Sequence, residues 1–258
     1  MTNQEHWLNV AKQLYENKIA EPVLWLGDDK HYKEAKQIFG NNVQSMLQFV
    51  HRPFLFKDTD YTLNEVRKSK KVKPIRLSLL PNEIKQIENS KKRKNLFIQI
   101  ILPLILEENN RILIDRKRLF SILNKNKNSK KEINWLNMKF KQYGVLNKDI
   151  PTLKVRMDVI PVSLAIAQAA KETGWGTSRF ALEGNALFGQ WTWSGEGIKP
   201  AGAENDTKHK VMKFKVLKAS VRAYQRNLNT HSSYKNFRQL RAQLRDDNKK
   251  LDSLLLAD

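Results

Sequence analysis

The sequence predicts a mainly helical protein that carries a small β-rich lobe in its C-terminal half. Apolar residues recur at helical spacing before residue 150 and again after residue 158. Residues 185–217 are instead rich in Gly, Trp and Thr, and their "KVMKFKV" alternates apolar and polar positions as a half-buried strand does. A content of 40% hydrophobic and 28% charged residues is typical of a globular chain, so wholesale disorder is not expected.

The N-terminal part differs from the rest, and we expect residues 1–50 to be an accessory segment of unknown role. Within it, residues 22–27, "PVLWLG", suit a buried strand, and residues 28–40 suit a helix that begins at Asp and ends at Gly. Residues 51–94 hold the charge runs "RKSKKVK" and "NSKKRK", which predict a basic linker or arm. The start of the chain has no basic region followed by an apolar stretch, so we predict no signal peptide.

The first strong helical pattern covers residues 95–123. It predicts one long helix, or two that join near Pro103 or Asn109–Asn110. Its apolar run "LFIQIILPLIL" is too short to cross a bilayer, so we predict a buried helix and no transmembrane segment. A polar loop at 124–132 and a short amphipathic helix at 133–144 follow. The apolar positions of the long pattern are Leu104, Ile105, Ile112, Leu113 and Leu119.

A further helix is expected to begin near Pro161 and to end at Gly174, and its last turn carries Glu172. The unpaired carbonyls of a helix C-terminus disfavour an ionised carboxylate, and Trp175 is expected to exclude water from it. A Glu that stays protonated near neutral pH can donate a proton to a leaving oxygen. The alternative is an exposed Glu whose repulsion from the helix end is screened by solvent.

The residues that follow, "GWGTSRFALEGNALFGQWTW", combine aromatic side chains with glycines. Sugar rings stack on aromatic faces, and glycines let the backbone approach a ligand closely. The alternative is an aromatic core under the lobe. The last predicted elements are helices at 217–230 and 234–246.

A net charge of +21 favours a polyanionic partner, and the basic excess begins after residue 50. Nucleic acid, acidic lipid and acidic polysaccharide all fit, as does a chain with Lys on solvated faces. The chain has no Cys, which excludes disulfides and thiolate metal sites. Its 5 His show no close ligand spacing, so we predict no metal and no cofactor.

The segment "AIAQAAKETGWGTSRFALEGNALFGQW" resembles the bacterial peptidoglycan glucosaminidases of glycoside hydrolase family 73, and within them the Bax-type proteins. The family pattern A-x-A-A-x-E-[ST]-G-W-G-x-S is matched at Ala167 through Ser178, and N-x-L-F-G is matched at Asn185 through Gly189. Weaker matches are "FKVLKASVRAY" and "SYKNFRQLR". The resemblance covers about residues 90–250, and it assigns residues 95–258 to a glucosaminidase-like domain.

This resemblance implies a lysozyme-like helical fold with a small β-lobe. It also implies an endo-beta-N-acetylglucosaminidase that cleaves the β-1,4 bond on the N-acetylglucosamine side of peptidoglycan. Glu172 matches the general acid of the family, and Glu204 best matches its second carboxylate in the lobe. The substrate-binding positions carried over are Trp175, Asn185, Phe188, Gly189, Trp191, Tyr224 and Tyr234.

Several alternatives stay open. Glu196 and Asp206 also lie in the lobe, and inverting, retaining and substrate-assisted mechanisms all fit the sequence. A basic nucleic-acid-binding protein and a non-cleaving wall-binding relative are the competing functions, although no nucleic-acid motif is present. The family implies action in the cell envelope or periplasm. The chain ends before a further tyrosine-bearing helix of the family, which leaves open whether its C-terminus is truncated.

Overall fold

The computed structural model describes residues 61–72, 77–199 and 209–257. The strand and helix predicted at 22–27 and 28–40 therefore lie outside the described residues. The chain forms two compact units. The first contains the described residues up to Leu104 together with Ala170–Lys218, and the second contains Ile105–Ala169 and the residues from Ala219 onward.

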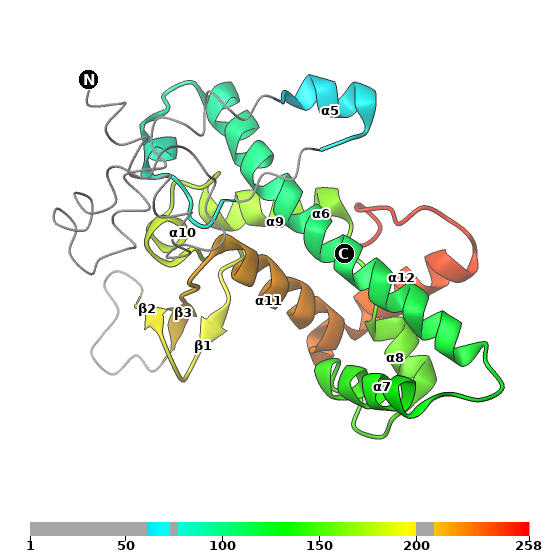
Figure 1. The fold of residues 1–258 in the computed structure, drawn as a ribbon. Helices are drawn as coiled ribbons and strands as arrows, with labels where there is room; N and C mark the ends of the chain where they lie inside the picture. Colours follow the sequence, from blue (N-terminus) through cyan, green and yellow to red (C-terminus); the bar gives the residue numbers. More distant parts are fainter. Residues whose placement is uncertain (1–60, 73–76, 200–208, 258) are drawn as a thin grey trace, which may run out of the picture. The chain divides into compact units, whose positions relative to one another are not determined.

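The described residues are mainly helical with a small sheet, which confirms the predicted fold class (Figure 1). Several of the helices begin at a residue whose side chain caps the first turn. Ser129, for example, accepts a hydrogen bond from the Glu132 amide, while the Glu132 carboxylate accepts one from the Ser129 amide. The helical elements are α5 (Leu63–Ser69), η2 (Asn82–Gln86), α6 (Ser90–Leu123), α7 (Lys130–Gln142), α8 (Ile150–Arg156), α9 (Val162–Thr173), α10 (Arg179–Gly184), α11 (Leu217–Thr230), η3 (Ser232–Tyr234) and α12 (Lys235–Asp246).

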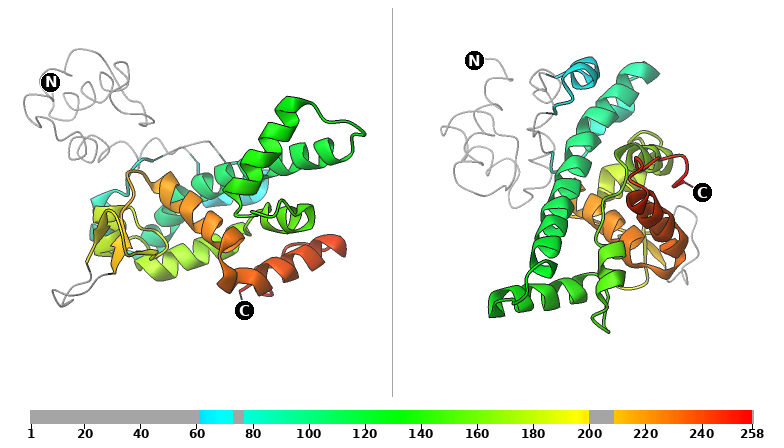
Figure 2. Two further views of the ribbon diagram at one scale, coloured as in Figure 1. Left: turned by 90° about the horizontal axis from the view of Figure 1, so that it is seen from below. Right: turned by 90° about the vertical axis from the view of Figure 1, so that its right-hand side faces the viewer.

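The long helix α6 is continuous, and it turns into α7 after a short loop (Figure 2). Pro103 lies inside it, so neither predicted break separates two helices. At the second predicted break, Asn109 is buried and serves a tertiary contact instead. Its amide donates to the Ile160 carbonyl at 2.8 Å and accepts from the Ile160 amide at 3.2 Å. The predicted apolar stripe is buried except at Leu113, which is 45% exposed.

The β-lobe belongs to the first unit and consists of three short antiparallel strands in the order β1-β3-β2. They are β1 (Trp191–Thr192), β2 (Gly197–Ile198) and β3 (Lys210–Met212). Val211 of β3 pairs with Trp191 of β1 and with Ile198 of β2. The strand predicted at 210–216 ends early, because the Phe214 amide donates to the Gly184 carbonyl at 2.8 Å.

The first unit also buries part of the segment expected to be a basic linker or arm. Residues 77–80 are buried, and the Ser78 carbonyl accepts a hydrogen bond from the Leu217 amide at 2.8 Å. This part of the segment is therefore packed, because "LSLL" supplies apolar surface between the charge runs. The domain boundaries stay a prediction.

The second unit has its own hydrophobic core, which gathers side chains from α6, α7, α8 and the loops beside them. The core consists of Ile112, Leu119, Ile122, Trp135, Phe140, Tyr143, Val145, Leu153 and Met157.

No helix in the described ranges is long and apolar enough to cross a membrane.

Candidate active site in the first unit

The last turn of α9 and the residues after it form a tight reversal of the chain. The Trp175 amide donates to the Ala170 carbonyl at 2.9 Å, and Gly174 has a φ of +56°. This six-to-one hydrogen bond over a left-handed residue is the Schellman ending of a helix. Ser178 then caps α10, since its hydroxyl accepts from the Ala181 amide. The E-T-G-W-G-T-S motif is thus a connector between two helices.

Gly176 lets this connector lie against the core of the first unit. Its φ is +85°, and an added Cβ would lie 3.0 Å from Ile84 Cδ1 and from Phe97 Cδ2, and 3.1 Å from Leu80 Cδ2. The approach is closer than ordinary van der Waals contact. The second glycine of the motif therefore holds the position of the connector, and with it the end of α9 that carries Glu172.

Trp175 does not shield Glu172 in the way that the sequence suggested. Its backbone is left-handed, with a φ of +60°, which is rare for a bulky residue. Its ring meets the Phe97 ring edge to face at 6.0 Å, and Lys94 Nζ lies 5.1 Å from its centroid. Glu172 itself is exposed. The predicted exclusion of water by the indole is wrong, because the indole packs toward the first turns of α6.

The two family motifs meet at Glu172 and Gly189. A Cβ built on Gly189 would lie 2.7 Å from Glu172 Oε2 and 3.6 Å from Glu172 Cδ. Gly189 also has a φ of +56°, which favours glycine. The missing side chain of Gly189 therefore leaves the space that the Glu172 carboxyl occupies, although 17 residues separate the two in sequence.

Asn185 and Phe188 are buried, with 3% and 9% of their surface exposed. Asn185 ends α10 in the left-handed conformation, and its Nδ2 donates to the Phe214 carbonyl at 3.0 Å. Its Oδ1 is buried and has no hydrogen-bond partner within the described ranges. Both side chains are therefore largely buried, and their role in lining a cleft stays a prediction.

Trp191 begins β1 and is 46% exposed, and its ring meets the His209 ring at 4.7 Å. Trp193 is 76% exposed, which the sequence reasoning missed as a candidate. The signal was present in "WTW", which places a second indole two residues after Trp191, just beyond the end of β1. The β-lobe therefore offers exposed indole surface of the kind on which sugar rings stack.

Tyr224 and Tyr234 belong to the second unit. Tyr224 is 4% exposed, and its phenol donates to Gln168 Oε1. Burial, together with the nearby Tyr234, raises the pKa of Tyr224 above its ordinary value. Tyr234 is half-buried, and its ring lies 6.3 Å from that of His231. Tyr224 is thus a buried hydrogen-bond donor, and only Tyr234 keeps partial access to solvent.

Two candidates for the second carboxylate, Glu204 and Asp206, lie outside the described residues. Glu196 immediately precedes β2 and is exposed. Among residues 61–72, 77–199 and 209–257, no three His, Cys, Asp or Glu side chains gather in a way that could hold a metal ion.

Comparison with known proteins agrees with the motifs. Residues 148–254 match the glucosaminidase family, described as mannosyl-glycoprotein endo-beta-N-acetylglucosaminidase. The chain is also similar to Protein bax of Escherichia coli strain K12, with 36% identity over 174 residues. That alignment covers 65% of this chain and 62% of the relative, so the chain spans less than two thirds of the protein it matches. No solved structure matches. The residues that match this family, 148–254, include both Glu172 and Gly189.

Proposed function

We propose that this chain is a glycoside hydrolase that cleaves the β-1,4 bond of N-acetylglucosamine in bacterial peptidoglycan, with Glu172 as the general acid. The contact between the Glu172 carboxyl and Gly189 carries the proposal, because it joins the two most specific motifs at one ionisable group. The family match supports the reaction class. We expect the place of action to be the cell envelope or periplasm.

The exposure of Glu172 is compatible with this role. A proton donor has to reach the glycosidic oxygen, and an exposed carboxyl can do so. The removal of water, which would keep the carboxyl protonated, then has to come from the bound glycan. Trp191 and Trp193 are exposed indoles in the same unit on which sugar rings could stack.

The first test is Glu172→Gln, which keeps the shape of the side chain and removes the proton. We expect the release of new reducing ends from purified sacculi to fall by about 10²–10⁴-fold, the usual contribution of general acid catalysis. Glu183→Gln is the matched control, because Glu183 is an exposed carboxylate of the same unit on α10. Mass spectrometry of the released muropeptides should find N-acetylglucosamine at the reducing end.

Four results would contradict the proposal. Unchanged turnover in Glu172→Gln would show that Glu172 is not the general acid. N-acetylmuramic acid at the reducing ends would show that the enzyme cleaves the other glycosidic bond of the strand. Binding to sacculi without new reducing ends would identify a non-cleaving relative. Salt-dependent binding to duplex DNA, with no effect on sacculi, would favour the nucleic-acid alternative.

The second catalytic group remains a proposal on sequence grounds. We propose that Glu204 acts from the β-lobe, either as a base or by orienting the substrate's own acetamido group. Glu204→Gln belongs in the same assay, and Glu196→Gln shows whether another carboxylate of the lobe has the role.

A further inference from the structure

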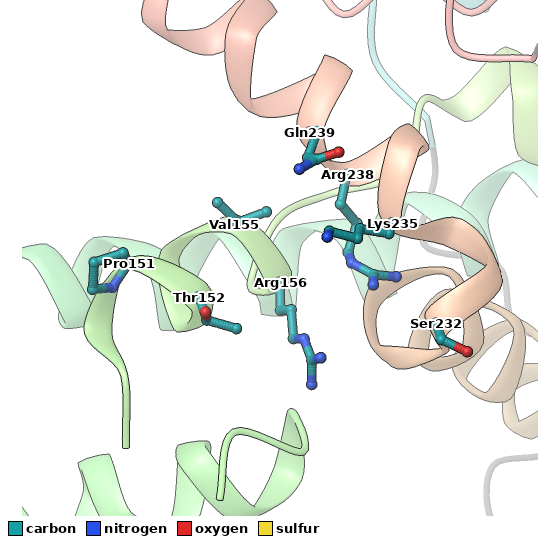
Figure 3. A pocket seen from close by; sticks show the side chains of 8 residues that line it. All are labelled: Pro151, Thr152, Val155, Arg156, Ser232, Lys235, Arg238 and Gln239. Carbon is teal, nitrogen blue, oxygen red and sulfur yellow. The ribbon is translucent and has the colours of Figure 1, made fainter. Parts of the chain in front are cut away.

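A pocket of about 400 Å³ lies in the second unit, between α8, η3 and α12 (Figure 3). Its volume is within the range of small-molecule sites, which is about 300–1,000 Å³. It belongs to neither of the two motifs that form the candidate active site. Its lining residues are Pro151, Thr152, Val155, Arg156, Ser232, Lys235, Arg238 and Gln239.

Among the described residues, three cations and no acidic side chain line the pocket. Arg156 comes from α8, Lys235 and Arg238 come from α12, and all three line the pocket (Figure 3). Within the described part of the chain, none of the three forms an ion pair. Other basic residues of this unit do have carboxylate partners, namely Arg111 and Arg222 with Glu108, Arg116 and Arg245 with Asp158, and Lys139 with Asp115.

Of the three cations, Arg238 is the strongest indication of an anion site, because it is only 4% exposed. Its Nη1 donates to the carbonyls of Leu228 at 2.8 Å and His231 at 2.7 Å. Burial lowers the pKa of Arg238, and the positive charge of Arg156 lowers it further. A buried guanidinium that faces another cation without a counterion is unfavourable, and a bound anion would relieve this repulsion.

Arg156 is held in place by the backbone. Its Nη1 donates to the carbonyls of Tyr143 at 2.8 Å and Gly144 at 2.9 Å. These bonds use one nitrogen of the guanidinium, so its other N–H groups stay available to a ligand. Because both arginines are fixed by main-chain carbonyls, the pocket is already arranged for a planar anion.

We propose that this pocket binds the free carboxylate of a short peptide. Pro151, Val155 and the methyl group of Thr152 add an apolar wall, which suits small aliphatic side chains beside the carboxylate. The assignment of that peptide to the stem of a peptidoglycan strand rests on the proposed function. The second unit would then recognise the peptide, while the glycan is cleaved at Glu172.

The test is calorimetric titration with soluble muropeptides, measured on the Glu172→Gln protein so that the ligand is not consumed. One ligand keeps its peptide carboxylates, and the other has them converted to amides. We expect amidation to weaken binding at least about tenfold, since a hydrogen bond to a charged group contributes about 1.5–3 kcal/mol. Lys235→Gln and Arg156→Gln should weaken binding of the free acid by a similar factor and leave binding of the amide unchanged.

Lys117→Gln is the matched control, because it removes one charge from an exposed position of the same unit outside the pocket. Equal binding of acid and amide, or equal losses in Lys117→Gln and Lys235→Gln, would overturn the proposal. So would inorganic phosphate that binds as tightly as the muropeptide, which would indicate a general anion site. Binding of the free acid by a protein that releases no reducing ends would uphold the pocket and reject only the proposed hydrolysis.

Discussion

The absence of a side chain at Gly189 makes room for the carboxyl of Glu172, which is distant from it in sequence. The carboxyl oxygen occupies the place where any other residue at position 189 would carry its Cβ. Because Glu172 Oε2 is the end of a flexible side chain, a larger residue at 189 would displace the carboxyl more readily than it would disrupt the backbone. Gly189 is therefore a positioning residue for the proposed acid.

Gly189→Ala should lower kcat for sacculi by about tenfold or more, because a displacement of about 1 Å can have a large effect on a reacting group. The free energy of unfolding should fall by only about 1–2 kcal/mol from the left-handed backbone. Turnover and urea denaturation measure the two effects.

Gly195→Ala is the control for Gly189→Ala. Gly195 has a φ of +91° in the same unit, but nothing lies within 4 Å of its added Cβ. The Gly195→Ala variant should lose about as much free energy of unfolding as Gly189→Ala does, and it should keep the turnover of the wild type. An equal loss of activity in both variants would show that backbone strain, and not the contact with Glu172, is responsible.

At the scale of the element, the connector between α9 and α10 determines where the end of α9 lies. Thr173 Oγ1 accepts from the Gly176 amide at 2.9 Å, and Thr177 Oγ1 donates to the Gly174 carbonyl at 2.8 Å. The conspicuous residues between Glu172 and Ser178 are thus occupied with local hydrogen bonds. These bonds hold the end of α9, and with it the carboxyl to which we assign the proposed chemistry.

Gly176→Ala should reduce the free energy of unfolding by about 1–3 kcal/mol more than Gly195→Ala does. Both substitutions strain a left-handed backbone, but only Gly176→Ala also crowds the buried side chains of Ile84, Phe97 and Leu80. Urea denaturation of the two variants, followed by tryptophan fluorescence, measures the difference. Equal midpoints would mean that the core adjusts without loss and that close approach is not the reason for Gly176.

At the scale of the whole molecule, buried carboxylates compensate some of the arginines of a strongly basic chain. Glu108 is fully buried and accepts hydrogen bonds from Arg111 and Arg222. Asp158 is 2% exposed and accepts two hydrogen bonds from Arg245. Burial alone would raise the pKa of Asp158, but the Arg245 hydrogen bonds and the charges of Arg241 and Arg116 hold it below the ordinary value.

Stability should therefore fall in acid. A carboxyl whose pKa is lower in the folded state contributes stability above its unfolded pKa, about 3.9 for Asp. That contribution is lost as the pH falls from about 4 through the folded pKa. Asp158→Asn should reduce the free energy of unfolding at pH 7 by about 3–5 kcal/mol, because it leaves arginines without their partner. It should also flatten the acid limb of the stability profile.

Asp247→Asn is the control for Asp158→Asn, since Asp247 pairs with Lys249 at the surface. Its effect should be within about 1 kcal/mol. Urea denaturation between pH 3 and 7 measures both variants. The prediction is contradicted if the free energy of unfolding of the wild type does not fall in acid. It is also contradicted if the free energy of unfolding of Asp158→Asn falls with pH as steeply as that of the wild type.

The sequence alone was sufficient for the features that depend on neighbours within a few residues. The helix predicted at 217–230 is observed as α11, Leu217–Thr230, because apolar spacing acts over single turns. The motif that ends at Ser178 indicated the family and the carboxyl to which the proposed chemistry is assigned. Mainly helical architecture with a small lobe also followed from local patterns.

Only the tertiary structure decided which side chains are buried and what they contact. Trp175 packs on Phe97, Asn185 donates to the Phe214 carbonyl, and Asn109 joins α6 to Ile160 without breaking the helix. The cations of the pocket lie on α8 and α12, about 80 positions apart, so the sequence does not show that they share one pocket. Burial and charge compensation depend on residues that packing brings together from distant parts of the chain. A local sequence pattern does not show which residues those are.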